Sequence, residues 1–170
     1  MGGDGSSGRK VRSKKMKEFT EKAKRAIQDA SEPAKRNVFI SFAAEDIDEV
    51  NLLRGQAKND MTDLDFNDRS LFEPFESKKA EYIKRGIRER IKQASVTLVY
   101  LTSSSATSKW VDWEIKESLR QGKAVIGVFQ GPARPQRIPG AAKDAGIPII
   151  PWRHKDIMRA IAKATSYRKN

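Results

Sequence analysis

From residue 37 onward, short apolar runs alternate with segments in which apolar residues recur every three or four positions. The short runs predict five strands, over residues 38–42, 64–66, 95–101, 124–129 and 147–152. The periodic segments predict helices, over residues 46–59, 78–94, 108–122 and 155–167. Strands that alternate with helices build a parallel sheet that is covered on both faces. We therefore expect a flavodoxin-like, doubly wound α/β fold with three αβα layers and strand order 2-1-3-4-5.

The first, third and fourth strands should supply most of the core. The residues expected to be buried are Val38, Ile40, Leu98, Val99, Val125, Ile126 and Val128. The last strand contains two prolines, which have no backbone N–H to donate to a neighbouring strand. This strand should therefore lie at an edge of the sheet. The Pro- and Gly-rich stretch 131–146 reads as a connection with a short helical turn near 141–144.

The predicted helix 108–122 carries the most informative pattern. One face should turn to the core, with the residues Val111, Ile115, Ser118 and Leu119. The Ser/Thr cluster 102–108 offers N-caps, and Gly122 ends the helix.

A second face of the same helix brings together Trp110, Trp113 and Glu114, at spacings of three and four. A carboxylate beside two indoles can bind a polar ring compound. Spacing alone favours the plainer interpretation, a solvated surface glutamate between half-buried aromatics.

The N-terminal part has a different character. Residues 1–8 are rich in Gly and Ser, and residues 12–30 can form a helix that ends before Pro33. Its apolar stripe consists of Met16, Phe19, Ala23, Ala26 and Ile27, with Lys and Arg elsewhere. We expect a flexible basic extension over 1–35 and one domain over 36–170. The stripe favours a packed helix or solvated tail over a partner-binding or membrane-surface role.

Charge and composition narrow the chemistry. The net charge of the 170 residues is +12, and residues 1–37 supply 11 basic against 5 acidic side chains, half of that excess. Such a segment suits an anionic partner. Without cysteine there is no thiolate catalysis and no Cys-based zinc site, and His154 alone cannot build a multi-histidine metal site. Since no apolar run approaches the roughly 18 residues of a membrane span, and no signal peptide is visible, we expect a soluble, cytoplasmic protein.

Three doubly wound families do not fit. The loop after the first strand ends in Glu45 and Asp46, which would repel the phosphate that a flavodoxin binds there. The third strand ends without the phosphoacceptor carboxylate of a response-regulator receiver. The Gly-x-Gly-x-x-Gly turn of a dinucleotide-binding Rossmann domain is absent.

A fourth family does fit. Residues 37–46 (NVFISFAAED) resemble the first conserved box of Toll/interleukin receptor (TIR) domains, and residues 108–115 (SKWVDWEI) resemble their Trp-x-x-x-Glu block. Residues 122–128 (GKAVIGV) resemble the strand that follows. The resemblance covers residues 36–164, and the spelling of the Trp-Glu block and of the Ser70-Leu71 loop looks closest to the bacterial Thoeris-type branch and its archaeal relatives.

This resemblance implies an enzyme that consumes NAD⁺ by cleaving the nicotinamide–ribose bond, to give ADP-ribose or a cyclic isomer, in antiphage defence signalling. It implies Glu114 as the catalytic carboxylate, ionised near a helix N-terminus. The residues it implies in substrate binding are Ser41, Phe42, Ala43, Ser70, Leu71 and Trp110. It also implies self-association, with NAD⁺ as substrate and neither cofactor nor metal.

Two other functions remain open at this point. Adaptor TIR domains share the fold but act as interaction modules, and fold does not fix function. Ala43 and Ala44 also stand where many nucleotide-cleaving members carry a basic residue or Gly. Nucleic-acid binding through the basic extension is the third function. The lack of aromatic residues interleaved with basic ones along a strand argues against it.

Overall fold

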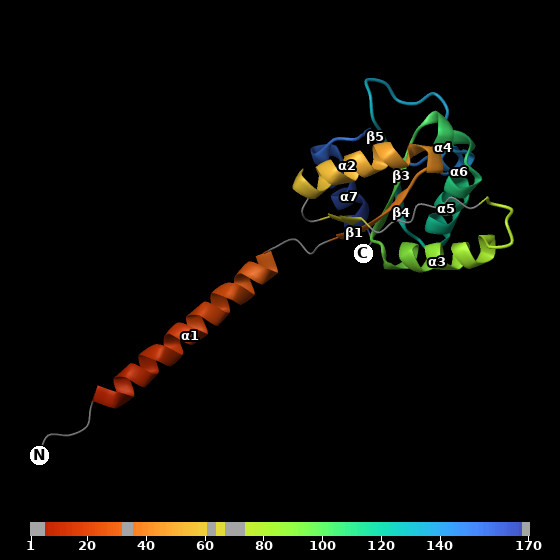
Figure 1. Cartoon of the computed structure of the whole chain (residues 1–170). Helices are drawn as coiled ribbons and strands as arrows, with labels where there is room; N and C mark the ends of the chain where they lie inside the picture. Colours follow the sequence, from red (N-terminus) through yellow and green to blue (C-terminus); the bar gives the residue numbers. More distant parts are fainter. Residues whose placement is uncertain (1–5, 32–35, 61–63, 67–73, 168–170) are drawn as a thin grey trace, which may run out of the picture. The chain divides into compact units, whose positions relative to one another are not determined.

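The computed structural model describes residues 6–31, 36–60, 64–66 and 74–167, with side chains over 14–27, 36–57 and 74–167. The chain divides into two compact units, residues 1–34 and 35–170, which we describe separately. In the first unit the described residues form the helix α1 (Ser6–Ser31) (Figure 1). Among the described residues, no helix combines the length and the apolar character that crossing a bilayer requires.

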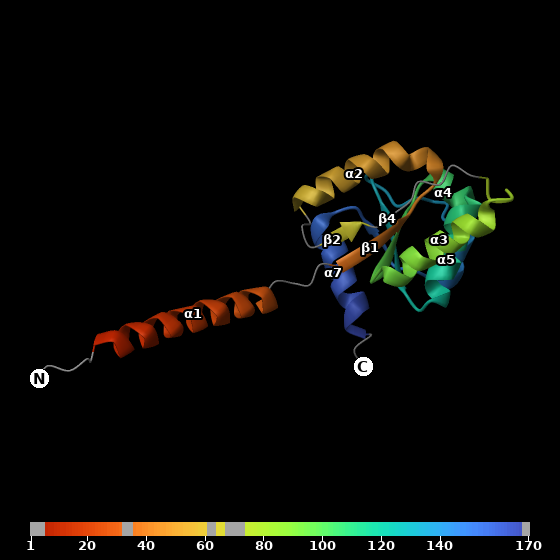
Figure 2. The same cartoon turned by 60° about the horizontal axis from the view of Figure 1, so that its bottom comes forward.

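A five-stranded parallel sheet forms the centre of the second unit (Figures 1 and 2). Its strands are β1 (Arg36–Ser41), β2 (Leu64–Phe66), β3 (Val96–Tyr100), β4 (Ala124–Phe129) and β5 (Ile149–Pro151). The order is β2-β1-β3-β4-β5, so the predicted topology is confirmed and the proline-containing strand lies at an edge.

Helices cover both faces of this sheet. They are α2 (Ile47–Asp60), which follows the 3-10 turn η1 (Ala44–Asp46), α3 (Ala80–Gln93), α4 (Ser103–Thr107), α5 (Lys109–Arg120), α6 (Gly140–Ala145) and α7 (His154–Ser166). Helices α2 and α7 pack into one core cluster, while α3, α5 and α6 pack on the opposite face. Figure 2 shows α3 beside β1, over the same face as α5.

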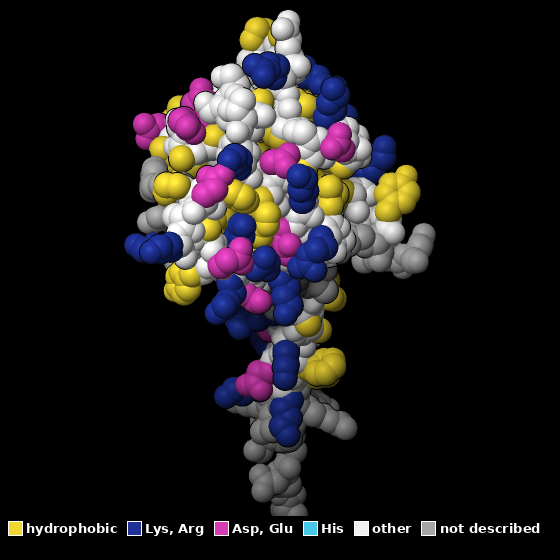
Figure 3. All heavy atoms as spheres, turned by 90° about the vertical axis from the view of Figure 1, so that its right-hand side faces the viewer, with side chains coloured by type: hydrophobic (Ala, Val, Ile, Leu, Met, Phe, Trp, Pro, Cys, Tyr) yellow, Lys and Arg dark blue, Asp and Glu magenta, His cyan; other side chains and the backbone are white. Residues whose placement is uncertain are grey.

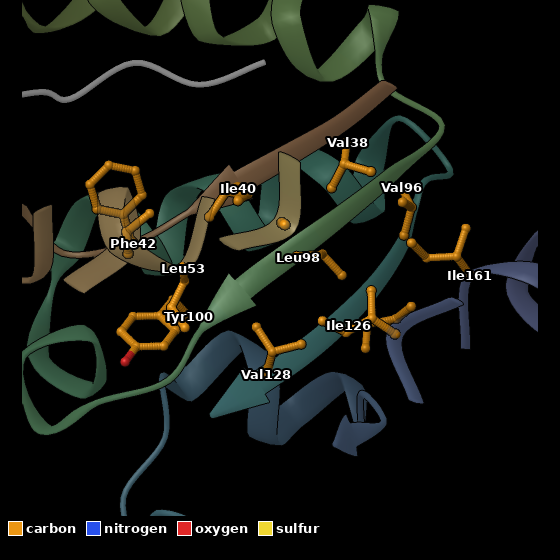
Figure 4. Close-up of a cluster of buried hydrophobic side chains, with 13 residues drawn as sticks. Val38, Ile40, Phe42, Leu53, Val96, Leu98, Tyr100, Ile126, Val128 and Ile161 are labelled. Carbon is orange, nitrogen blue, oxygen red and sulfur yellow. The ribbon is translucent and has the colours of Figure 1, made fainter. Parts of the chain in front are cut away.

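Strand β1 divides its side chains between the two faces, because successive residues of a strand point in opposite directions. Val38 and Ile40 enter the cluster with α2 and α7, which Figure 4 shows in detail. Phe39 packs against α3 instead. All seven residues expected to be buried are buried, which confirms the predicted core.

Two details of the central helix region differ from the prediction. Leu119 is 39% exposed, so it does not belong to the core face with Val111 and Ile115. The Ser/Thr stretch before α5 forms a short helix of its own, α4, in which the side chains of Thr102 and Ser105 cap each other's backbone N–H groups. Because such a polar run has no apolar period, the sequence pattern did not predict this helix.

Candidate functional site

Ser41 and Glu114 meet where β1 ends. Ser41 is the last residue of β1, and alternation turns its side chain toward α5. Glu114 lies in the second turn of α5. The Ser41 hydroxyl donates a short hydrogen bond to Oε2 of Glu114, across 73 residues of sequence. The structure thus joins two residues that the TIR resemblance places in the substrate site.

Glu114 is buried rather than solvated, with only 5% of its surface exposed. Burial removes water from the carboxylate and raises the pKa of Glu114 to about 8, while the Ser41 hydrogen bond acts in the opposite direction. The expectation of an ionised, partly exposed glutamate is therefore wrong for the free protein. Desolvation in mid-helix outweighs the small stabilisation that a helix N-terminus gives an anion.

Aromatic rings extend from Glu114 toward the start of α5. The ring centroids of Trp110 and Trp113 are 6.1 Å apart in an edge-to-face arrangement, and Phe75 lies 4.9 Å from Trp110 at 76°. Both indoles pack against the cluster formed by Phe39 and α3. The predicted face of Trp110, Trp113 and Glu114 therefore exists, but it packs against the protein.

An open groove of about 360 Å³ adjoins these rings. Its described lining residues are Phe75, Ala106, Thr107, Ser108, Lys109, Asp112, Trp113 and Lys116. Two cations lie near its aromatic wall: the Lys84 ammonium is 4.3 Å from the Phe75 ring centroid, and the Arg88 guanidinium is 5.4 Å from that of Trp113. Trp113 thus links the groove to Trp110.

Phe42 and Trp110 do not come together. Phe42 follows Ser41, so its side chain enters the opposite core layer, with Ile40 and Leu53 (Figure 4). The relative exposure of Phe42 is 9%, and that of Ala43 is 1%. Phe42 and Trp110 therefore pack in different clusters, on opposite faces of the sheet. Ser70 and Leu71 lie outside the described residues.

A second polar network, which sequence reasoning missed, joins the end of β3 to the start of α2. The Thr102 hydroxyl donates to Oδ2 of Asp46 at 2.6 Å, and the Tyr100 hydroxyl donates to Oε2 of Glu49 at 2.9 Å. Burial raises the pKa of Asp46, although the Thr102 hydrogen bond opposes that shift. A carboxylate after one strand and a hydroxyl after its parallel neighbour were the available signal, since such ends share one edge.

Glu117 is the second buried carboxylate of α5, and its environment differs from that of Glu114. Arg120 donates two hydrogen bonds to it, at 2.6 and 2.9 Å, and Gln121 donates one at 2.7 Å. The Arg120 hydrogen bonds lower the pKa of Glu117, so it stays ionised. Within the described ranges, no group of three His, Cys, Asp or Glu side chains is arranged to hold a metal ion.

Comparison with known proteins places this geometry in a family. The family model described as "Thoeris protein ThsB, TIR-like domain" matches residues 39–133, more than half of the chain. A curated protein of Bacillus cereus (strain MSX-D12), named "Putative cyclic ADP-D-ribose synthase ThsB1", is 32% identical over 97 residues. The match covers 55% of this chain and 50% of that protein, so the chain spans about half the length of this curated relative.

Solved structures with a similar chain course include the TIR domain of the Toll-related receptor TRR-2 from Hydra magnipapillata. It has a TM-score of 0.49 and 17% identity, over 78% of this chain and 95% of that one. The CMP N-glycosidase BcmB of Clostridium botulinum has a TM-score of 0.45 and 14% identity, over 75% of this chain and 97% of that one. With the family match over residues 39–133, the chain belongs to the Thoeris ThsB family of TIR-like domains.

Proposed function

We propose that this protein cleaves the nicotinamide–ribose bond of NAD⁺ and releases a cyclic ADP-ribose isomer as a signal in antiphage defence. The observation that supports the proposal is the buried Ser41–Glu114 pair at the carboxyl end of β1, with Trp110 four residues before Glu114 on α5. Ligands of doubly wound sheets bind outside the carboxyl ends of the strands. The name of the Bacillus cereus relative, a cyclic ADP-D-ribose synthase, supports the choice of substrate and of a cyclic product.

The bond to be broken joins ribose C1′ to the pyridinium nitrogen. Its electron pair moves to that nitrogen, so nicotinamide leaves as a neutral base and no general acid is required. Positive charge then develops on the ribose, as in glycoside cleavage. The carboxylate of Glu114 stabilises this charge and binds the ribose hydroxyls. Attack on C1′ by a nitrogen of the same molecule's adenine gives the cyclic isomer, and attack by water, which then loses a proton, gives ADP-ribose.

The raised pKa of Glu114 gives this site a preference for a cationic base. In the free protein near neutral pH the carboxyl group is largely protonated. A pyridinium ring nearby favours the ionised form, so it lowers the pKa and the proton leaves as the substrate binds. A neutral dihydronicotinamide offers no such stabilisation, and its ring is a poorer leaving group.

Trp110 lies one helical turn before Glu114 on α5 and can provide an aromatic surface on the same side of that helix. Its ring is held edge-on between Phe75 and Trp113, which limits its motion. An indole fixed in this way can stack on the nicotinamide ring or wall the pocket. Trp110→Ala should therefore reduce NAD⁺ turnover, but it also removes packing, which makes it the less selective probe.

The decisive experiment compares two matched glutamine variants at high protein concentration, because we also propose that self-association completes the active state. Glu114→Gln keeps the shape and hydrogen-bonding capacity of the side chain and removes the charge. Loss of one preorganised electrostatic group should lower kcat by about 10²–10³. Glu117→Gln makes the same change on the same helix, at the same 5% exposure, and should leave kcat near the wild-type value.

Chromatography of nicotinamide and of the ribosyl products provides the measurement, and it separates linear from cyclic ADP-ribose. Equal NAD⁺ consumption by the wild type and Glu114→Gln would show that this carboxylate is not catalytic. If the assembled wild type consumed no NAD⁺, the interaction-module function would replace the enzyme. A linear product alone would retain the cleavage and reject the cyclisation.

A further inference from the structure

Helix α1 carries an apolar stripe that is exposed to solvent. Met16, Phe19 and Ile27 are 66%, 72% and 69% exposed, far more than any side chain of the core. At about 100° per residue these three side chains, together with Ala23 and Ala26, occupy an arc of roughly 100° of the helix. Figure 3 shows hydrophobic side chains along one edge of the described part of this helix.

The rest of the helix surface is strongly basic. Over residues 14–27 there are six basic side chains and two acidic ones, a net charge of +4. The basic residues are Lys14, Lys15, Lys17, Lys22, Lys24 and Arg25. On the helical projection Lys15 and Lys24 are the charged residues nearest the two borders of the stripe, where long stems can follow an apolar surface while the ammonium stays in water.

A second copy of the same helix is a poor cover for this stripe. In heptad terms Met16 and Ala23 take one core position, and Phe19 and Ala26 the other, so half of the seam is alanine. The flanking positions hold Lys15 and Lys22 on one side without acidic residues to pair with. Pairing two such helices would bring like charges together around a thin core.

Nucleic acid would use the charge but leave the stripe unexplained. Contacts to a phosphate backbone come from Lys, Arg and polar groups, and they need no continuous row of Met, Phe and Ile side chains. One kind of partner can contact both the apolar stripe and the basic face of the helix: a surface with anionic headgroups above an apolar interior.

We propose that residues 14–27 of α1 lie flat on an anionic lipid bilayer, with the Met16–Phe19–Ile27 stripe in the acyl boundary and the basic side chains among the headgroups. The helix rests on the membrane without crossing it. This partner is independent of NAD⁺ cleavage, so the proposal stands or fails separately from the enzymatic one.

The test is sedimentation of the full chain with vesicles of phosphatidylcholine alone and of an equal mixture of phosphatidylcholine and phosphatidylserine. We expect binding to the mixed vesicles that weakens with salt, and little binding to the neutral ones. Phe19→Ala should weaken binding to the mixed vesicles about tenfold, because the variant can no longer bury one large apolar side chain in the acyl boundary.

Tyr82→Ala is the matched control, since Tyr82 is 71% exposed on α3 of the other unit and Phe19 is 72% exposed. It should bind mixed vesicles like the wild type. Unchanged binding by Phe19→Ala would overturn the proposal, because charge alone would then explain the attraction. Concentration-dependent self-association that Phe19→Ala abolishes, without vesicle binding by the wild type, would assign the stripe to a second copy instead. Equally tight binding of wild type and Phe19→Ala to nucleic acid, with none to vesicles, would assign the helix to that partner.

Discussion

Glu114 and Glu117 lie three residues apart on α5, are equally buried, and have carboxyl pKa values displaced in opposite directions. Glu114 has one hydroxyl donor and a desolvated surrounding, whereas Glu117 has a bidentate arginine. One residue type therefore has two roles on one helix. Glu117 stays ionised and pairs with Arg120, whereas burial favours the protonated form of Glu114.

Stability measurements should separate these roles. Between the unfolded pKa of 4.5 and the folded value of about 8, native Glu114 holds a proton that the unfolded chain has lost. The wild type therefore loses stability as pH rises through this window. Glu114→Gln has no such proton, so its melting temperature should exceed that of the wild type increasingly toward pH 8. Thermal unfolding at both ends of the window measures this difference, and a constant difference would contradict the raised pKa of the buried Glu114 carboxyl group.

Glu117→Gln serves again as the control, with the opposite sign. The folded pKa of Glu117 is lowered, so its contribution to stability is present above its unfolded pKa of 4.5 and is lost as pH falls through its folded value. The variant should be less stable than the wild type at neutral pH, because Arg120 and Gln121 lose their charged acceptor.

Ser41 should act as a positioning residue for Glu114. Its hydrogen bond favours the ionised carboxylate, so Ser41→Ala should raise the pKa of Glu114 further. The wild-type kcat/KM for NAD⁺ is expected to rise with pH through about 8, and in Ser41→Ala this rise should move to higher pH. Ser41→Thr, which restores a hydroxyl, should recover part of the wild-type profile. An unshifted profile in Ser41→Ala would mean that the hydroxyl does not control this proton.

At the scale of single residues, the sequence predicted which residues belong to the candidate site, but it did not predict how deeply Glu114 is buried. Helical spacing placed Glu114 beside Trp110, and the TIR resemblance singled out Ser41. The burial of Glu114 could not be foreseen, because charged residues on helices are mostly solvated. The Ser41–Glu114 contact depends on how α5 is seated on β1, which local pattern does not specify.

Among the elements, α6 depends on a neighbour for its cap. Its N-cap position is Pro139, which makes no side-chain hydrogen bond. Asp112 of α5 instead accepts a hydrogen bond from the backbone N–H of Ala141, at 2.7 Å, and pairs with Lys116. The two helices are therefore joined through a helix cap donated from another element.

Asp112→Ala should lower the free energy of unfolding by about 1–2 kcal/mol, the usual cost of losing a capping side chain. Asp112→Asn keeps an acceptor and should cost less. Asp144→Ala changes the same residue type at an exposed position of α6 and should have a negligible effect. Chemical denaturation of the three variants gives the values, and equal losses for Asp112→Ala and Asp144→Ala would rule out the cap.

Elements with a strong apolar period were predictable, and polar ones were not. The pattern gave all five strands and the long helices, and it placed a helical turn near 141–144, where α6 forms. Helix α4 was not predicted, because its residues are Ser, Ala and Thr and show no apolar period. Reciprocal capping between Thr102 and Ser105 stabilises it. Leu119 was misplaced because the buried face of α5 is narrower than its apolar sequence suggests.

For the whole molecule, the alternation of strands and helices together with the right-handed crossover rule was enough to predict the sheet order. We expect the second unit to fold without the first, because its core clusters draw only on residues from Val38 onward. Deleting residues 1–30 should leave the melting temperature of the TIR-like domain unchanged. A large drop on deletion, measured by calorimetry, would mean that the apolar stripe of α1 belongs to the core.

Strand β1 also bears on how such a domain can diverge. Ser41 and Phe42 are neighbours in the chain, but Ser41 contacts α5 and Phe42 packs against α2. Mutations that reshape the layer around Phe42 can therefore accumulate without touching the carboxyl partner of Ser41.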